Sequence, residues 1–341
     1  MGWHLAVNAG SSSLKLAAFG LDGRAQASVR LAEMSVADLG RDALSEAIAR
    51  LHQSGPPVAT GHRVVHGLDR TAPARLDAAT RAVIARAAGF APLHNPPALR
   101  VIDLCADLFP GTAQVACFDT AFHAGNPRVA TTLPIPASLR DAGLRRYGFH
   151  GLSYASVVRR FTGVTGQALP RRLLIAHLGA GASMAAVLDG RGHATTMGFS
   201  PMDGLPMATR AGAMDPGVIF HLMRQGHAPD AVERMLNRDS GLLALGGTPS
   251  MKDLLARDDD AARFAVAHYI HWATRHAGAL CAAMGGIDAM VFTGGVGENA
   301  APIRDGIATG LAWAGLDPAC VHVIPADEEG EIAAALRDPA G

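Results

Sequence analysis

Three glycine-rich turns are the residues of this sequence whose type and spacing most directly suggest chemistry. Residues 10–15 combine glycine with hydroxyls and a cation, residues 179–183 offer little besides backbone donors, and residues 294–299 follow an apolar run. Small residues let backbone N–H groups approach an anion, and a glycine-rich turn that opens a helix often binds phosphate. None of the turns matches the P-loop or the full dinucleotide fingerprint. Together they predict a site for nucleotide phosphates.

Two other patterns could indicate a metal site, and we favour neither. His62 and His66 are four residues apart, as zinc ligands on a helix can be. The Arg-Val-Val between them favours a strand, which would place both imidazoles on one face but much further apart. The four cysteines lie far apart and fit no ligand spacing, which is typical of buried thiols in a reducing compartment.

Strands and helices must both contribute to positioning these turns. Short apolar runs predict strands at residues 4–8, 14–19, 64–66, 115–118, 173–177, 184–188, 289–293 and 321–324. Longer, Ala-rich segments predict helices at residues 41–52, 78–88, 97–108, 154–161, 216–224, 229–237 and 261–284. The alternation indicates an α/β fold in which helices cover mixed or parallel sheets.

An internal repeat relates the first two turns. Residues 5–13 read LAVNAGSSS and are followed by Leu-Asp-Gly-Arg at 21–24, while residues 174–182 read LIAHLGAGA and are followed by the same four residues at 188–191. Each copy is typical of strand, small-residue turn, strand and Asp-Gly hairpin turn. Two similar hairpins could arise by chance, but the matching order of several features favours duplication. We therefore expect two related domains whose turns could face one ligand across a cleft.

The composition limits the class of protein. A chain of 341 residues exceeds the usual size of one hydrophobic core, which also favours two domains. The 49% hydrophobic and 18% charged residues argue against disorder. The 30 Lys and Arg residues balance 30 Asp and Glu residues, which gives no argument for nucleic acid or a membrane surface. No apolar run reaches the roughly 18 residues of a membrane span, so we expect a soluble cytoplasmic protein.

The turns lie among longer and more specific strings. The strings are NAGSSSLK at 8–15, GHRVVHG at 61–67, APLHNP at 91–96, FDTAFH at 118–123, RRYGFHG at 145–151, HLG at 177–179, the segment 201–215, SGLL at 240–243 and FTGGVGEN at 292–299. In order and sequence they resemble the acetate kinase family, which comprises acetate, propionate and butyrate kinases, from residue 5 to about residue 329.

The resemblance implies both a fold and an activity. The fold is that of duplicated actin-like (ribonuclease H-like) domains with a ligand cleft between them, as in sugar kinases and actin. The first domain is expected at residues 1–121, completed by a C-terminal helix at 328–341, and the nucleotide-binding domain at 122–327. The activity is reversible transfer of the γ-phosphoryl of ATP to acetate or propionate, giving ADP and an acyl phosphate, with Mg²⁺ or Mn²⁺. The implied partners are a nucleotide, a short-chain carboxylate and a second copy in a homodimer.

The resemblance also assigns catalytic roles. A carboxylate acceptor is already an anion, so catalysis should rest on positioning, metal and cationic clamps rather than on a general base. Arg63 and Arg210 would be the clamps, because a guanidinium grips carboxylate or phosphoryl oxygens at two points. His150 would hydrogen-bond the transferring phosphoryl, and Asp119 would be an acid near metal or acceptor. On composition alone, salt-bridged arginines and a packed core histidine remain open alternatives.

Binding residues follow from the same strings. Asn8 and Glu328 would be associated with the metal, although Glu328 also fits an acid at a helix N-terminus. Ser11 and Ser13 belong to the same N-terminal phosphate and metal segment. The wall around the acyl tail would consist of Val65, Leu93, Phe149 and Pro201. The nucleotide phosphates would be bound by Lys15, His177, Gly179, Gly181, Gly294, Gly295, Gly297 and Asn299.

Departures from the family pattern concentrate around the nucleotide and leave a second function open. Ala180 replaces an Asn, Ala213 replaces an Asp, and Met251 stands where a carboxylate is expected beside the nucleoside. Ala180 and Ala213 favour a catalytically weak relative that binds nucleotide or acyl phosphate as a sensor. The charged residues Arg63 and Arg210, with Asp119, His150 and Glu328, favour an active kinase. A structural or chaperone protein of the actin type would give the two arginine strings no role.

Overall fold

The computed structural model describes residues 2–10, 13–32 and 36–337, in two compact units. Unit 1 consists of Met1–Ala124, Phe149–Ser156 and Asp327–Gly341, and unit 2 of Gly125–Gly148 and Val157–Ala326. The first domain was expected to end at residue 121, whereas residues 122–124 and 149–156 also belong to unit 1. The reason is close packing, because Gly151 leaves no room for a Cβ against the carbonyl of Asp119. Ser11 and Ser12 lie outside the described residues.

Unit 1 is built on a six-stranded mixed sheet with the order β3-β2-β1-β4-β6-β5. The strands β1, β2 and β3 form an antiparallel meander, β4 and β6 continue it in parallel, and β5 closes the edge. The bounds are Trp3–Ala9 for β1, Ser13–Gly20 for β2, Ala25–Ala32 for β3, Ala59–Val64 for β4, Ala74–Arg75 for β5 and Ala113–Phe118 for β6.

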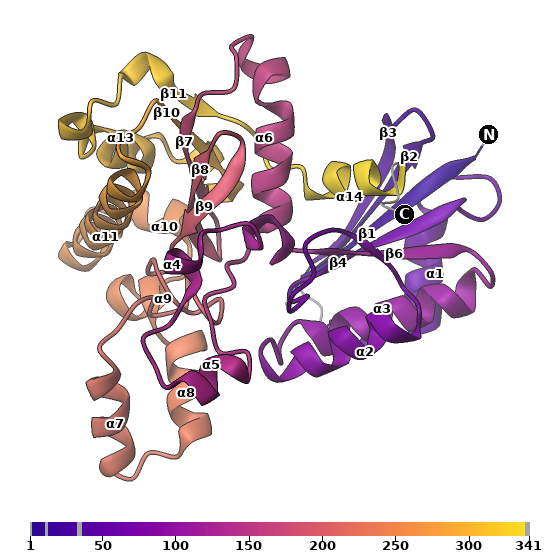
Figure 1. Ribbon diagram of the computed structural model, residues 1–341, viewed down its shortest axis with the longest axis horizontal. Helices are drawn as coiled ribbons and strands as arrows, with labels where there is room; N and C mark the ends of the chain where they lie inside the picture. Colours follow the sequence, from indigo (N-terminus) through magenta and orange to yellow (C-terminus); the bar gives the residue numbers. More distant parts are fainter. Residues whose placement is uncertain (1, 11–12, 33–35, 338–341) are drawn as a thin grey trace. The chain divides into compact units, whose positions relative to one another are not determined.

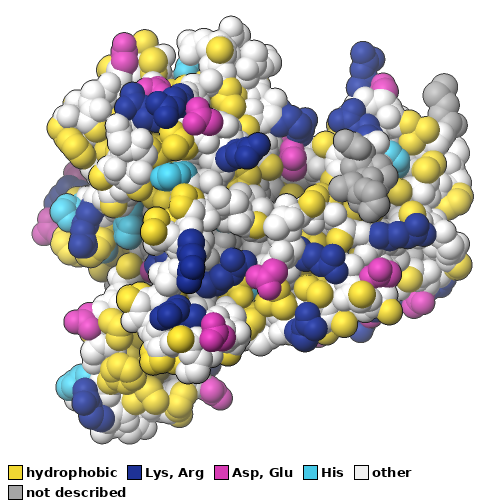
Figure 2. Space-filling model, viewed as in Figure 1, with side chains coloured by type: hydrophobic (Ala, Val, Ile, Leu, Met, Phe, Trp, Pro, Cys, Tyr) yellow, Lys and Arg dark blue, Asp and Glu magenta, His cyan; other side chains and the backbone are white. Residues whose placement is uncertain are grey.

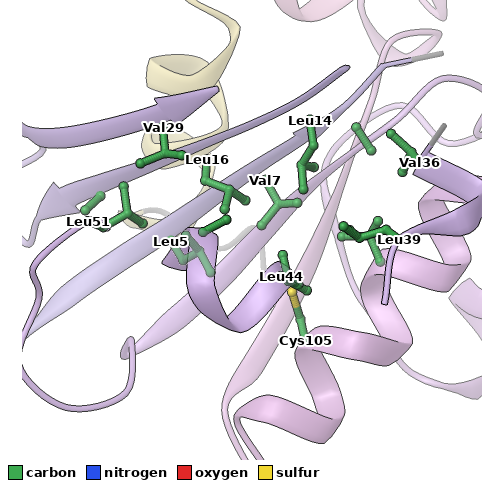
Figure 3. Close-up of a cluster of buried hydrophobic side chains, with 14 of the residues drawn as sticks. Leu5, Val7, Leu14, Leu16, Val29, Val36, Leu39, Leu44, Leu51 and Cys105 are labelled. Carbon is green, nitrogen blue, oxygen red and sulfur yellow. The ribbon is translucent and has the colours of Figure 1, made fainter. Parts of the chain in front are cut away.

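Both faces of this sheet are covered, which explains why β1 is buried along its whole length. Leu5 and Val7 point into a cluster with Leu44 of α1 (Arg41–Ala49) and Cys105 of α3 (Asn95–Leu108), as Figure 3 shows. Residues one position along point to the other face. There Ala6 packs with α14 (Glu328–Arg337), which lies across the sheet from α1 and α3 in Figure 1. The helix α2 (Ala78–Arg86) packs beside α3.

Unit 2 repeats this plan in a five-stranded sheet with the order β11-β10-β7-β8-β9. Its strands β7, β8 and β9 form the antiparallel meander, while β10 and β11 are parallel to β7. The order β9-β8-β7-β10-β11 therefore corresponds to β3-β2-β1-β4-β6, and the duplication predicted from the Asp-Gly repeat is confirmed in the fold. The bounds are Arg172–Leu178 for β7, Ala182–Leu188 for β8, Arg191–Thr195 for β9, Ala289–Thr293 for β10 and Val321–Val323 for β11.

Helices surround this second sheet. The 25-residue helix α11 (Asp260–Met284) packs against β7, β8 and β9, and α13 (Ala301–Thr309) packs on α11. Phe161 of α6 (Gly151–Thr165) meets His322 of β11 edge-on, with ring centroids 5.4 Å apart. The other helices are α4 (Arg128–Thr131), α5 (Ala137–Asp141), α7 (Pro216–Arg224), α8 (Pro229–Arg238), α9 (Gly241–Gly246), α10 (Met251–Leu255) and α12 (Gly294–Asn299).

Most predicted elements are present, and two differences matter for the site. The strand predicted at 64–66 is wrong in position, because β4 ends at Val64 and residues 65–66 continue beyond the paired region. The turn predicted at 294–299 is itself a short helix, α12.

Exposed apolar side chains gather on α7, where Phe220 is 59% exposed, and Figure 2 shows hydrophobic side chains over this part of unit 2. Within the described ranges, no helix combines the length and apolarity needed to cross a bilayer.

Candidate active site

The candidate site of unit 1 lies where the parallel strands β4 and β6 end. Arg63 is the penultimate residue of β4, and Asp119 directly follows β6. The N–H of Asp119 donates to the carbonyl of Val64 over 3.0 Å, which holds the end of β6 against β4. Arg63 then donates from Nε and Nη2 to Asp119 Oδ2, at 3.0 and 2.7 Å. Ligands of α/β folds commonly bind at this edge of a sheet.

Two further elements bring polar side chains to Arg63. Asn8 on β1 accepts from Arg63 Nη1 through Oδ1 at 3.2 Å. Its Nδ2 donates to Glu328 Oε2 and Glu329 Oε1, both at 2.7 Å, at the start of α14. Arg63 Nη1 also lies 3.5 Å from Glu328 Oε2, and Lys15 Nζ lies 3.7 Å from Glu329 Oε1. Residues separated by as many as 321 positions thus form one polar network within unit 1.

Burial dominates the electrostatics of this network. Burial raises the pKa of Asp119, while the guanidinium of Arg63 opposes that shift. Burial alone would lower the pKa of Arg63, but Asp119 and Glu328 together outweigh it and raise the pKa. An ion pair taken out of water contributes little net stability, because desolvation offsets the attraction. The fully buried Asp119 also retains an Oδ1 without a hydrogen-bond partner in the described chain. The network is therefore better explained by binding than by stability.

The carboxylates of Glu328 and Glu329 could supply only some of the ligands that a metal ion needs. Across residues 2–10, 13–32 and 36–337, no three His, Cys, Asp or Glu side chains are grouped closely enough to hold an ion by themselves. Mg²⁺ commonly takes one or two carboxylates and completes its shell with water and phosphate oxygens. Glu328 and Glu329 at the start of α14 could supply that share. Asn8 presents its amide nitrogen to both, and a nitrogen of this kind orients carboxylates rather than binding a cation.

Apolar residues beside this network are held by a second set of hydrogen bonds. Val65 and Phe149 are 5% and 1% exposed, whereas Leu93 is 41% exposed. His66 follows Val65, and its ring meets that of Phe149 edge-on at 5.7 Å. The buried Asn95 accepts from the N–H of His66 at 3.1 Å and donates to its carbonyl at 2.9 Å. The segment after β4 is therefore fixed to the start of α3, two residues beyond Leu93.

His150 lies at the entrance to α6 in a strained conformation. Its φ of 57° is in the left-handed region, which non-glycine residues seldom adopt. Its carbonyl accepts from the N–H of Tyr154 at 3.1 Å, the first backbone bond of the helix. The preceding carbonyl, of Phe149, bonds to Nε2 of the buried His123 at 2.9 Å. These contacts over-determine the backbone and fix His150 within unit 1.

Unit 2 holds Arg210 in a tight loop. Arg210 Nη1 donates to the carbonyl of Pro201 at 3.1 Å and contacts Met207 Sδ at 3.8 Å. Among the described residues it forms no ion pair. Burial lowers the pKa of Arg210, and the nearby charge of Arg238 adds to that effect. A half-buried cation without a carboxylate is a prepared site for an anion.

A cavity of about 650 Å³ opens beside the glycine-rich turns of unit 2. Gly179, Gly295 and Asn299 line it, whereas His177, Gly181, Gly294 and Gly297 belong to the same turns without lining it, and Lys15 lies in unit 1. The remaining wall combines apolar side chains with a few polar ones: Ala180, Leu242, Pro249, Ser250, Met251, Lys252, Leu255, Tyr269, Val296 and Ala300.

The third glycine turn is held by one carboxylate. Glu298 Oε1 accepts from the N–H of Gly294 and from the N–H of Ala326, both at 3.0 Å. Gly294 has a φ of 78° and leaves no room for a Cβ beside the backbone of Leu178, so only glycine fits there. The sequence reasoning missed Glu298, Glu329 and Asn95. Glu298 and Asn95 lie within the quoted strings and Glu329 follows Glu328, but the contacts of all three depend on partners distant in the chain.

Comparison with known proteins gives concordant results. The pattern that defines the acetokinase family matches residues 42–332. An acetate kinase of Rhizobium meliloti is 45% identical over 292 residues, which are 80% of this chain and 74% of that protein. An acetate kinase of Rhodopseudomonas palustris strain TIE-1 is 40% identical over 354 residues, which are 92% and 88% of the two chains.

Solved structures agree with these relatives. A propionate kinase of Francisella tularensis subsp. tularensis SCHU S4 superimposes with a TM-score of 0.88 at 31% identity, covering 98% of both chains. An acetate kinase of Porphyromonas gingivalis gives 0.86 at 29% identity, again over 98% of both chains. A glucokinase of the ROK family from Streptomyces griseus gives 0.51 at 16% identity over 100% of both chains, and shares the fold alone.

Proposed function

The chain belongs to the acetokinase family, and from that premise we propose that it transfers the γ-phosphoryl group of ATP to acetate or propionate. An oxygen of the acid would form a bond to the γ-phosphorus while the bond to the β–γ bridging oxygen breaks, giving an acyl phosphate and ADP. The carboxylate arrives ionised, so the step needs no base. The observation that carries the proposal is the polar network of Arg63, Asp119, Asn8 and Glu328.

The two arginines would perform different parts of the step. Arg210 has no carboxylate partner in the described chain, so its guanidinium is available to an incoming anion. Arg63 is oriented by Asp119 and Asn8, which fixes the direction of its remaining N–H groups. Preorganised cations of this kind stabilise charge that develops during phosphoryl transfer without reorganising at the moment of reaction. His150, with its constrained backbone, would hydrogen-bond the transferring group.

Magnesium would enter with the nucleotide. When bound, it would neutralise charge on the phosphate oxygens. Glu328 and Glu329 would hold it, and Asn8 and Lys15 would keep both carboxylates oriented. We retain Asn8 as part of the metal site in this orienting role.

The acid would be selected by apolar side chains. Val65, Phe149 and Leu93 would form the part of the acyl wall that unit 1 supplies, while Pro201 of unit 2 holds Arg210 through its carbonyl. An additional methylene in such a pocket changes discrimination by only about 1–3 kcal/mol, so kcat/KM for acetate and propionate should differ modestly.

Met251 is 3% exposed and lines the nucleotide cavity. It cannot accept a hydrogen bond as a carboxylate would, so ATP, GTP and ITP should all serve as donors.

A direct test measures acyl phosphate. The purified chain would be incubated with Mg·ATP and acetate, propionate or butyrate, and the product trapped as the hydroxamate. We expect product with acetate and propionate, and turnover that requires Mg²⁺. Nucleotide binding without product from any acid would favour the sensor alternative instead. Sedimentation of the same preparation would test the expected homodimer.

A further inference from the structure

The wall of the nucleotide cavity of unit 2 includes a buried tyrosine whose hydroxyl the fold leaves unsatisfied. Tyr269 is 1% exposed and lines the cavity, and its Oη has no hydrogen-bond partner among the described residues. Burial raises the pKa of this phenol, so the group stays protonated and can donate. Buried polar groups are nearly always hydrogen-bonded, because leaving one unpaired opposes folding. An exception at the wall of a cavity points to a ligand as the missing partner.

The setting of Tyr269 is otherwise apolar. Tyr269 belongs to the buried stripe of α11, which begins with Ala262 and Ala265 and continues one turn beyond it with Ala273. This stripe faces α9 and α10, since a Cβ at Gly246 would lie 3.1 Å from Ala265. Leu242 of α9 and Leu255 of α10 line the same cavity. The leucines on this side of the cavity therefore offer the hydroxyl no acceptor.

The polar groups of the cavity do not satisfy this hydroxyl. Ser250 Oγ accepts from the N–H of Asp253 at 3.2 Å and caps α10. Asn299 Nδ2 donates to the carbonyl of Gly295 at 2.9 Å. Lys252 is exposed and has no acceptor to offer. A phenylalanine would fill the same space at Tyr269 without leaving a polar atom unpaired, so packing alone does not explain the hydroxyl.

We propose that Tyr269 Oη hydrogen-bonds the nucleoside part of the phosphoryl donor and thereby contributes to its binding. The proposal rests on the proposed function, which supplies a nucleotide. Its phosphates would bind at the glycine-rich turns around Gly179 and Gly295, because small residues let an anion approach the backbone closely. The nucleoside would then occupy the apolar wall of α9, α10 and α11, where the hydroxyl is the missing polar contact.

Tyr269→Phe removes this hydroxyl and preserves the ring. Calorimetry on the full chain would compare ADP with tripolyphosphate, which carries phosphates but no nucleoside, and thermal unfolding would be measured without ligand. We expect ADP to bind about three- to tenfold more weakly, as for a lost neutral hydrogen bond, with tripolyphosphate unchanged. The unliganded variant should unfold at the same or a higher temperature, because an unpaired polar atom is gone.

A matched control is available in the same unit. Tyr147 is 5% exposed and does not line the cavity, and its hydroxyl donates to the carbonyl of Gly143 at 2.7 Å. Tyr147→Phe should therefore lower the unfolding temperature and leave the affinity for ADP unchanged, the reverse of the result at Tyr269.

Two outcomes would overturn the inference while leaving the proposed function intact. Equal ADP affinity in Tyr269→Phe and the parent would show that the hydroxyl does not contact the nucleotide. An equal loss for ADP and tripolyphosphate would place the hydroxyl on the phosphates. A parent chain that binds neither ADP nor ATP would instead reject the proposed function itself, and this inference with it.

Discussion

Arg63 and Arg210 have opposite surroundings, which gives their removal different consequences. Each Ala variant should lose about 10²–10³ in kcat, the cost of one preorganised contact to developing charge. Arg63→Ala also leaves Asp119 buried and unpaired, which should lower the free energy of unfolding by about 3–5 kcal/mol. Arg210→Ala removes an unpaired cation and should not destabilise the chain. Initial rates and urea unfolding would check both variants, and near-parental turnover in either would reject its role as a clamp.

Glu328 permits a sharp test of the metal assignment. Glu328→Ala should raise the Mg²⁺ concentration needed for half-maximal rate, because one of the two carboxylates oriented by Asn8 is lost. Glu331→Ala is the matched control, since Glu331 occupies the same first turn of α14. If Glu328 acted only through the helix terminus, the two variants would show the same magnesium titration. A shift confined to Glu328→Ala supports the metal role.

At the scale of the element, β4 presents different chemistry on its two faces. Arg63 points to the site, while the neighbouring His62 points into the fold and bonds Gln114 at 2.6 Å. Burial lowers the pKa of His62 to about 4, Gln114 opposes the shift, and Arg81 adds to it. The pKa of His123 is also lowered to about 4, by burial and against its bond to Phe149. Both imidazoles are therefore expected to be neutral in the folded chain at pH 5.

These buried histidines predict an acid-labile unit 1. Between pH 6.5 and pH 4 these imidazoles are protonated in the unfolded chain but stay neutral in the folded chain. The free energy of unfolding is therefore highest above this window and falls as the pH drops through it. A group with this shift contributes up to about 3 kcal/mol. Urea midpoints from pH 7 to pH 4.5 should fall more steeply in the parent than in His62→Gln. Parallel curves would contradict a neutral, buried His62.

Local signals predicted most elements, and non-local contacts account for what they missed. The Asp-Gly turns at 22–23 and 189–190 predicted the duplicated meanders, because the sequence signal for a hairpin turn spans only a few residues. The position of β4 was mistaken, because Gly61, His62 and Arg63 are not an apolar run, and the residues that cover Gly61, Ile332 and Leu336 of α14, lie far along the chain. Arg63, Asp119, Asn8 and Glu328 were expected from the resemblance, and the structure brings them together. Glu329 was missed because its partner, Asn8, is 321 positions away.

At the scale of the whole molecule, α14 makes a separable contribution to unit 1. Its Ile332 and Leu336 cover the face of the sheet formed by Ala6, Val115 and Cys117. A chain ending at Ala326 would lose this cover together with Glu328 and Glu329. We expect β1 to lose hydrogen-exchange protection while β7 in unit 2 retains it. Equal protection of β1 with and without α14 would show that the rest of unit 1 is stable alone.

The position of α14 in the chain also has a consequence for biosynthesis. The central strands of unit 1 are complete at Phe118, but the helix that covers one of their faces begins 210 residues later, at Glu328. At translation rates of about 5–20 residues per second, this interval lasts roughly 10–40 s. During that time the nascent chain exposes an apolar sheet face on the ribosome and lacks two acids of its site. A ribosome stalled before residue 328 would therefore present a chaperone substrate rather than a partly active enzyme.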